Sequence, residues 1–293
     1  MEPPETPAPE RRWPRLARWA VSLGGLAAVA VVTGGALFWG ERGWHSYRFD
    51  GVAARSALLV LIGPVVGGNP WPKDLKIEQF VPLPTGTALV RAGGRVWDYG
   101  GASPLTAEKD EVVSFGLVEG ALTVLTREGR LAAWSEGGLL DLQDVLDKTR
   151  LKARPVRLES DAQGSRFFLF FDGPDNPLVR LSAKKLEVLT GSPEPIAAVC
   201  ADAERTLFAV GEDLFELRKP GEPLLIHSAS RPILGLAARG KAVYYSTAGG
   251  VYRLKGKDER KVIEGLAGPL SASEGGLYVL DSASGRLFRI RGA

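Results

Sequence analysis

Six segments of the chain repeat one pattern: a glycine, two or three apolar residues, a polar turn with glycine, and a second strand in which apolar and charged residues alternate. The clearest copy, GLYVLDSASGRLFRI, covers Gly276–Ile290, and another, GALTVLTREGRLAAW, begins at Gly120. The residues that open the second strands are Arg95, Arg130, Pro177, Asp213, Gly250 and Arg286, in steps of 35, 47, 36, 37 and 36 residues. This near-constant period predicts a chain built from repeated structural units.

Each unit contains more than the hairpin. A short apolar strand precedes it, as at Ile196–Cys200 and Ile233–Ala237, and most units have another strand after it, as at Leu224–His227. Alternation in segments such as Val251–Leu254 is typical of half-buried antiparallel strands. Four strands at this period describe a propeller blade. The predicted fold is therefore all-β, a six-bladed β-propeller preceded by a single transmembrane α-helix.

The one long step contains LLDLQDVLDKTRLK, residues 139–152. Its apolar residues Leu139, Leu142, Val145 and Leu146 have helical spacing, which predicts a short amphipathic helix inserted between two units.

The last unit has its inner strand near Leu270–Ser273 and its hairpin at Leu277–Ile290, after which only three residues remain. An open strand edge is a template for aggregation, so a strand from upstream of the first blade is expected to close the ring. The candidates are His45–Phe49 and Ala57–Gly63.

Residues 19–40 (WAVSLGGLAAVAVVTGGALFWG) contain no charged side chain and are long enough to span a bilayer as a helix. Trp19 and Trp39 stand at its ends, where indole rings favour the headgroup layer. Small residues inside it, such as Gly24, Ala28 and Gly35, allow close approach of a partner helix, although they are common in any membrane helix.

Four arginines precede this segment, which places the N-terminus in the cytoplasm and the propeller in the periplasm or otherwise outside the cytoplasm of a bacterial inner membrane. The alternative is a cleaved signal peptide, with small residues such as Gly34 and Ala36 near the cleavage site. The apolar run is longer than a signal core, and Phe38 closes it, so the anchor is preferred.

The predicted organisation is a disordered cytoplasmic tail at 1–18, a membrane helix at 19–40, a connector at 41–74 that could supply the closing strand, and the propeller at 75–293. The repeat consensus resembles the β-propeller superfamily, closest to PQQ-like and NHL-like repeats, over about residues 75–293. This resemblance implies architecture only. The Trp-Asp pair of WD40 blades occurs once, at Trp97-Asp98, and no functional residue can be carried over.

Catalytic motifs are lacking in the sequence. His45 and His227 have no companion at metal-ligand spacing, and there is no nucleophile elbow, P-loop or haem-attachment motif. The formal net charge is +3 without a basic cluster, which argues against nucleic-acid binding. No catalytic, cofactor or metal residue is therefore predicted.

Some six-bladed propeller hydrolases hold calcium in the central channel with carboxylate and asparagine side chains. Here Asp161, Asp202 and Glu274 follow predicted inner strands and are candidates for one mouth of the channel, whereas Asn69 and Asn176 lie in proline-flanked turns. Loop carboxylates are also often merely solvated.

The segment RFFLFFD places Phe167, Phe168, Phe170 and Phe171 on one strand. They cannot all face one side, so we expect packing between blades, with one ring exposed as the alternative.

The resulting hypothesis is a membrane-anchored, non-catalytic propeller that binds another membrane or envelope protein, with the lipid bilayer contacted through residues 19–40. The alternatives are a lactonase-like propeller hydrolase and a small-molecule sensor, both using the channel.

Overall fold

The computed structural model describes residues 48–49, 58–61, 76–83, 88–99, 103–118, 120–135, 138–141, 154–160, 167–173, 175–182, 185–202, 205–274 and 276–291. The chain divides into two compact units, Met1–Ser46 and Tyr47–Ala293, and every described residue belongs to the second. The predicted tail and membrane helix, with Trp19, Gly24, Ala28, Gly35 and Trp39, lie outside the described residues. Among those that are described, no helix has the length and apolar character needed to cross a bilayer.

The described residues form six antiparallel sheets, one for each repeat unit, and each sheet is a blade of the predicted propeller. The inner strands are β3 (Gln79–Pro82), β6 (Val112–Val118), β10 (Arg154–Ser160), β14 (Ile196–Ala201), β18 (Gly235–Arg239) and β22 (Leu270–Ser273). The second strands are β4 (Ala88–Ala92), β7 (Ala121–Thr126), β11 (Phe167–Asp172), β15 (Thr206–Val210), β19 (Ala242–Thr247) and β23 (Gly276–Asp281).

The third and outer strands complete the blades. The third strands are β5 (Arg95–Asp98), β8 (Leu131–Ser135), β12 (Leu178–Ser182), β16 (Asp213–Leu217), β20 (Gly250–Lys255) and β24 (Arg286–Arg291). The outer strands of blades two to five are β9 (Gly138–Asp141), β13 (Lys185–Thr190), β17 (Pro223–Ser228) and β21 (Asp258–Glu264). Four of the six predicted strand openings coincide with the first residue of a third strand, and Arg130 and Pro177 each precede one by a single residue.

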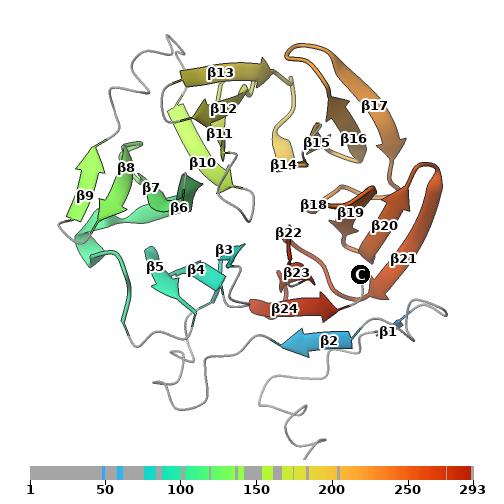
Figure 1. Ribbon diagram of the computed structural model, residues 1–293, viewed down its shortest axis with the longest axis horizontal. Coiled ribbons are helices and arrows are strands. Elements are labelled where there is room, and N and C mark those ends of the chain that lie inside the picture. Colours follow the sequence, from blue (N-terminus) through green and yellow to red (C-terminus); the bar gives the residue numbers. More distant parts are fainter. Residues whose placement is uncertain are drawn as a thin grey trace, which may run out of the picture. The chain divides into compact units, whose positions relative to one another are not determined.

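The inner strands follow one another around the centre of this unit (Figure 1). Ser114 bonds to Leu158, and the Leu117 N–H further along β6 donates to Ser160 Oγ further along β10, so these two inner strands run in the same direction. The outer strands lie toward the periphery. Every blade therefore presents the beginning of its inner strand to the same end of the ring.

The hydrophobic core is distributed between neighbouring blades, because both faces of every sheet are covered. Six separate apolar clusters occupy the six interfaces, including the one between blades six and one, where Tyr278 and Leu287 pack with Phe80 and Val90. The ring is thus closed by packing as well as by strand pairing.

Two strands from upstream of the first blade pair with the last two blades. β2 (Leu58–Leu61) pairs antiparallel with β24 and supplies the outer strand of blade six, and it lies within the candidate segment Ala57–Gly63. β1 (Arg48–Phe49) pairs with the outer edge of β21 in blade five. Figure 1 shows both strands beside their partner blades.

One local prediction needs correction, and blade one differs from the other blades. The helix predicted to begin at Leu139 is wrong at its start, because Gly138–Asp141 form β9, which pairs with β8; residues 142–153 lie outside the described part. Blade one has three strands in the described residues. The outer side of β5 is instead covered by a single bridge from Trp97 to Pro104, just before the short 3-10 helix η1 (Glu108–Asp110).

Candidate functional site

The centre of the ring holds a cavity of about 780 Å³, lined by residues of all six inner strands. Its volume is in the range of small-molecule sites, about 300–1,000 Å³. The lining includes four acidic residues and three arginines, namely Glu78, Glu159, Asp202, Glu274, Arg91, Arg157 and Arg239.

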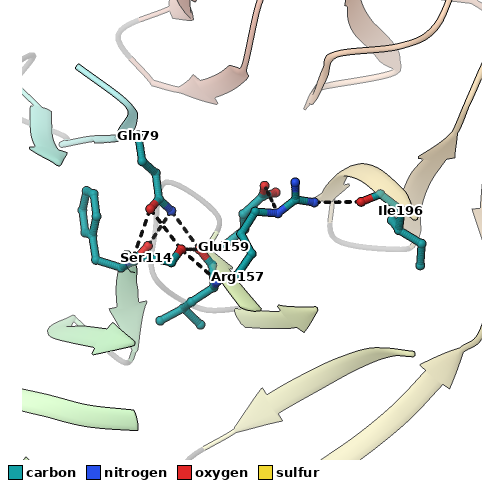
Figure 2. Close-up of polar contacts among 7 residues, drawn as sticks. Gln79, Ser114, Arg157, Glu159 and Ile196 are labelled. Carbon is teal, nitrogen blue, oxygen red and sulfur yellow. Dashed lines mark hydrogen bonds and ion pairs between the residues drawn. The ribbon is translucent and has the colours of Figure 1, made fainter. Parts of the chain in front are cut away.

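Gln79 joins three blades on one side of this channel (Figure 2). Its Nε2 donates to the backbone oxygens of Phe115 and Leu158, each at 2.8 Å, and its Oε1 accepts from Ser114 Oγ at 3.0 Å and from the Phe115 N–H at 3.1 Å. Since one amide side chain makes four hydrogen bonds to two neighbouring blades at a partly buried position, it has a structural role.

Arg157 reaches from β10 toward the next blade. Its Nη2 donates to the Ile196 backbone oxygen at 3.0 Å, its Nε lies 3.1 Å from Glu159 Oε1, and its Cζ lies 3.8 Å from the centroid of the Phe170 ring. Burial raises the pKa of the Glu159 carboxyl, and this effect outweighs the Arg157 guanidinium and the Val199 N–H, which lower it. The Arg157 side chain is therefore fixed in position, and burial makes the charged form of the Glu159 carboxyl less favourable than it would be in water.

Arg91 enters the channel from β4. Its Nη1 lies 2.6 Å from Glu78 Oε2, and its Nε is a buried donor without a hydrogen-bond partner among the described residues. Burial lowers the pKa of the Arg91 guanidinium more than Glu78 raises it, so Glu78 does not fully offset the cost of burying this charge.

The predicted channel mouth is found in part. Asp202 and Glu274 both line the cavity, beyond the ends of β14 and β22, whereas Asp161 lies outside the described residues. Asp202 accepts from the Arg205 backbone N–H at 3.0 Å and from Arg205 Nε at 2.8 Å. Its carboxylate therefore holds the turn between two strands, and Arg205 continues to the buried Glu216.

In the part of the chain that the structure describes, no group of three or more His, Cys, Asp or Glu side chains could hold a metal ion. Asn176 donates to the Ser192 backbone oxygen and is not part of the channel wall, and Asn69 lies outside the described residues. Burial raises the pKa of the Cys200 thiol, which disfavours the nucleophilic thiolate.

His227 is not among the residues that line the channel. His227 Nε2 lies 3.2 Å from Tyr245 Oη and 2.9 Å from Glu259 Oε2, which links outer strand β17 to blade five. His45 lies outside the described residues. The arrangement of His227 is that of an inter-blade contact.

Large apolar side chains are exposed in two places. Val188 on β13 and Leu224 and Leu225 on β17, which we call the rim patch, are 49%, 57% and 50% exposed. The Gly221 N–H donates to the Leu189 backbone oxygen at 2.7 Å, so the start of β17 adjoins β13. Val156 and Leu234 are exposed in the channel, where both line the cavity.

Comparison with solved structures defines the architecture. A gluconolactonase from Xanthomonas campestris matches with a TM-score of 0.61 and 12% identity, over 84% of this chain and 94% of that chain. A second protein assigned as a gluconolactonase matches with a TM-score of 0.59, 15% identity and coverage of 84% and 97%. BBS1N, solved in complex with ARL6DN, matches with a TM-score of 0.52 and 14% identity, over 77% of this chain and 80% of that chain.

The chain has the β-propeller fold. At these identities the likeness extends to the fold alone. No family profile matches the sequence, and no curated protein is significantly similar to it.

The residues that organise the channel were not found from the sequence. Gln79, Arg91, Arg157 and Glu159 make contacts with residues up to 79 positions away, as in the bond from Gln79 to Leu158. The one available signal was a polar residue that opens an otherwise apolar inner strand, as Gln79 does in QFVP.

Proposed function

We propose that this chain is a membrane-anchored, non-catalytic β-propeller that binds another envelope or membrane protein. The observation that carries the proposal is the rim patch, where three large apolar side chains on two neighbouring outer strands are about half exposed. Leu224 and Leu225 are consecutive residues of β17, so they expose apolar surface on both faces of its outer edge, and Val188 lies on the outer strand of the preceding blade. Exposed apolar surface on an outer strand is characteristic of interaction sites.

Backbone groups at the rim favour a protein partner. β17 pairs with β16 on one side, and among the described residues no strand pairs with its other side. Blade five, by contrast, has β1 on the outer side of its outer strand β21. An extended segment of a partner can add to β17 in the same way, with backbone hydrogen bonds giving affinity and apolar side chains packing on Leu224 and Leu225. Lipid chains cannot supply those hydrogen bonds.

The hydrolase alternative places a reaction in the channel. Here three of the channel carboxylates, Glu78, Glu159 and Asp202, are paired with arginines. A cation at any of them would have to displace a guanidinium. Turnover of glucono-lactone by the purified chain would favour the hydrolase.

The rim prediction is tested by photocrosslinking in native membranes. A benzophenone side chain at Leu224 should crosslink one defined partner, and the crosslinked peptide should be an extended apolar segment of that protein. The double substitution Leu224→Asp and Leu225→Asp should reduce co-purification of the same partner at least about tenfold, the effect of roughly 1.4 kcal/mol.

The matched control is Leu234→Asp, a change of the same kind at a channel residue of similar exposure, which should leave the partner bound. A crosslink from Leu224 only to lipid would contradict the proposal and assign the patch to the membrane surface. Partner capture that survives the double substitution would also contradict it.

The anchor is a separate part of the proposal and rests on the uncharged segment 19–40 and the arginines before it. The full chain should stay in the membrane pellet after washing with high salt or alkaline carbonate, because apolar burial, unlike charge attraction, is not weakened by salt. N-terminal sequencing should find residues before 19 on the mature protein. A mature N-terminus beyond Ala36 would show a cleaved signal peptide instead.

A further inference from the structure

We propose that the channel binds a small organic acid, with the carboxylate held by Arg157 and Arg91 and the apolar part of the molecule placed against Val156 and Leu234. This site is distinct from the rim patch and does not depend on it. Four observations carry the inference.

The first is that Arg157 is preorganised. The Phe170 ring and the Ile196 backbone oxygen hold its guanidinium, and Glu159 Oε1 lies 3.1 Å from its Nε, which makes no hydrogen bond among the described residues. Figure 2 shows its remaining nitrogen turned away from both polar partners. A guanidinium fixed in this way loses little entropy when it binds a carboxylate, and its fork matches two carboxylate oxygens.

The second is the unsatisfied donor of Arg91. A buried N–H without an acceptor is uncommon in folded proteins and indicates a missing partner. Glu78 only partly offsets the free-energy cost of burying the Arg91 charge, because burial lowers the pKa of the guanidinium more than Glu78 raises it. A carboxylate in the channel would provide both the acceptor and the opposite charge.

The third is the distribution of charge along the channel. Arg157 lies beside the first residue of β14, and the Glu78 N–H beside β3 bonds to the Arg91 backbone oxygen. Both arginines therefore lie at the end where the inner strands begin. Asp202 and Glu274 lie at the opposite end, beyond the last residues of their strands. The lining there also includes Arg239, the last residue of β18, so that end carries two carboxylates and one guanidinium and is less favourable for an acid.

The fourth is the apolar surface at the same end. Val156 lies near the start of β10 and Leu234 directly precedes β18. They are 45% and 41% exposed, and both line the cavity. Branched aliphatic side chains beside guanidinium groups suit a molecule with one carboxylate and a short hydrocarbon part.

Glu159 competes with the ligand for Arg157. Burial raises the pKa of its carboxyl, so the cost of neutralising it is reduced and the charge of Arg157 becomes available to a bound anion. Removing this carboxylate charge should therefore strengthen binding, whereas a merely structural ion pair would give no such gain.

The test is calorimetric titration of the full chain in non-ionic detergent with isovalerate, and with isovaleramide as the neutral molecule of the same shape. Isovalerate should bind at one site per chain, and the amide at least about tenfold more weakly, since charge-assisted hydrogen bonds are about twice as strong as neutral ones. Arg157→Met and Arg91→Met should each weaken isovalerate binding at least about tenfold. Glu159→Gln should strengthen it several-fold.

Arg127→Met is the matched control, because Arg127 is exposed in the turn between β7 and β8, pairs with Glu111 and does not line the cavity. It should leave binding unchanged. If Arg157→Met fails to fold, Arg157→Lys retains the positive charge but not the planar two-donor guanidinium, and it should still bind isovalerate more weakly than the unchanged chain.

Equal affinity for isovalerate and isovaleramide, no binding of either, or weaker binding in Glu159→Gln would overturn the proposal. The double substitution at Leu224 and Leu225 should not alter the titration, so the rim and channel proposals can fail separately.

Discussion

A shortened chain that begins at Lys73 should melt about 5–20 °C below one that begins at Gly43 and should be less monodisperse. The shorter chain lacks β2, whose four residues pair with β24, and it leaves the outer side of blade six open. If each pairing contributes a net 0.5–1.5 kcal/mol, its loss costs about 2–6 kcal/mol. One kcal/mol corresponds to about 2–4 °C in a domain of this size.

A chain that begins at Val52 is the matched control, because it keeps β2 and loses only β1, which forms two residue pairs with β21. Its melting temperature should stay close to that of the longer chain. Differential scanning calorimetry and size-exclusion chromatography measure both quantities. Equal melting temperatures and equal monodispersity for the Lys73 and Gly43 chains would mean that β2 is not needed for closure.

The substitution Phe168→Ala should lower the free energy of unfolding by about 3–5 kcal/mol, the usual cost of removing a buried phenylalanine ring. The ring is 1% exposed and packs between blades three and four, with Phe208 and Val199. Urea unfolding of the full chain in non-ionic detergent measures the effect. Val188→Ala, on the exposed part of the same blade, should change the free energy by less than about 0.5 kcal/mol. Comparable losses for the two variants would argue against a core between these blades.

The same strand shows what sequence could predict. Phe167 and Phe171 lie in the cluster shared with blade two, whereas Phe168 and Phe170 lie in the cluster shared with blade four. The expectation of inter-blade packing is confirmed, and the alternative of an exposed ring is wrong, because all four are buried. Period-two alternation assigns side chains to opposite faces, and the repeat period indicates that both faces are covered.

The misread segment at Leu139 shows the limit of local pattern. Leu139 and Leu142 have helical spacing, but Gly138 pairs with Ser135, and Gly138–Asp141 form a strand of the sheet. Pairing with β8 here overrides the local preference. The channel residues were missed for a related reason. The contacts of Gln79 with blades two and three depend on how the blades are arranged, and no local pattern encodes that arrangement.

The pairing of β2 with β24 also affects the order in which the protein can be completed. β2 is synthesised before any blade, and β24 follows every other strand of the ring in sequence. An apolar strand, LLVL, must therefore stay without its final partner while the five preceding blades emerge. Contacts this distant in sequence slow folding, and unpaired strand edges are exposed to aggregation in the meantime. The growing chain should thus need protection from aggregation until β24 has been synthesised.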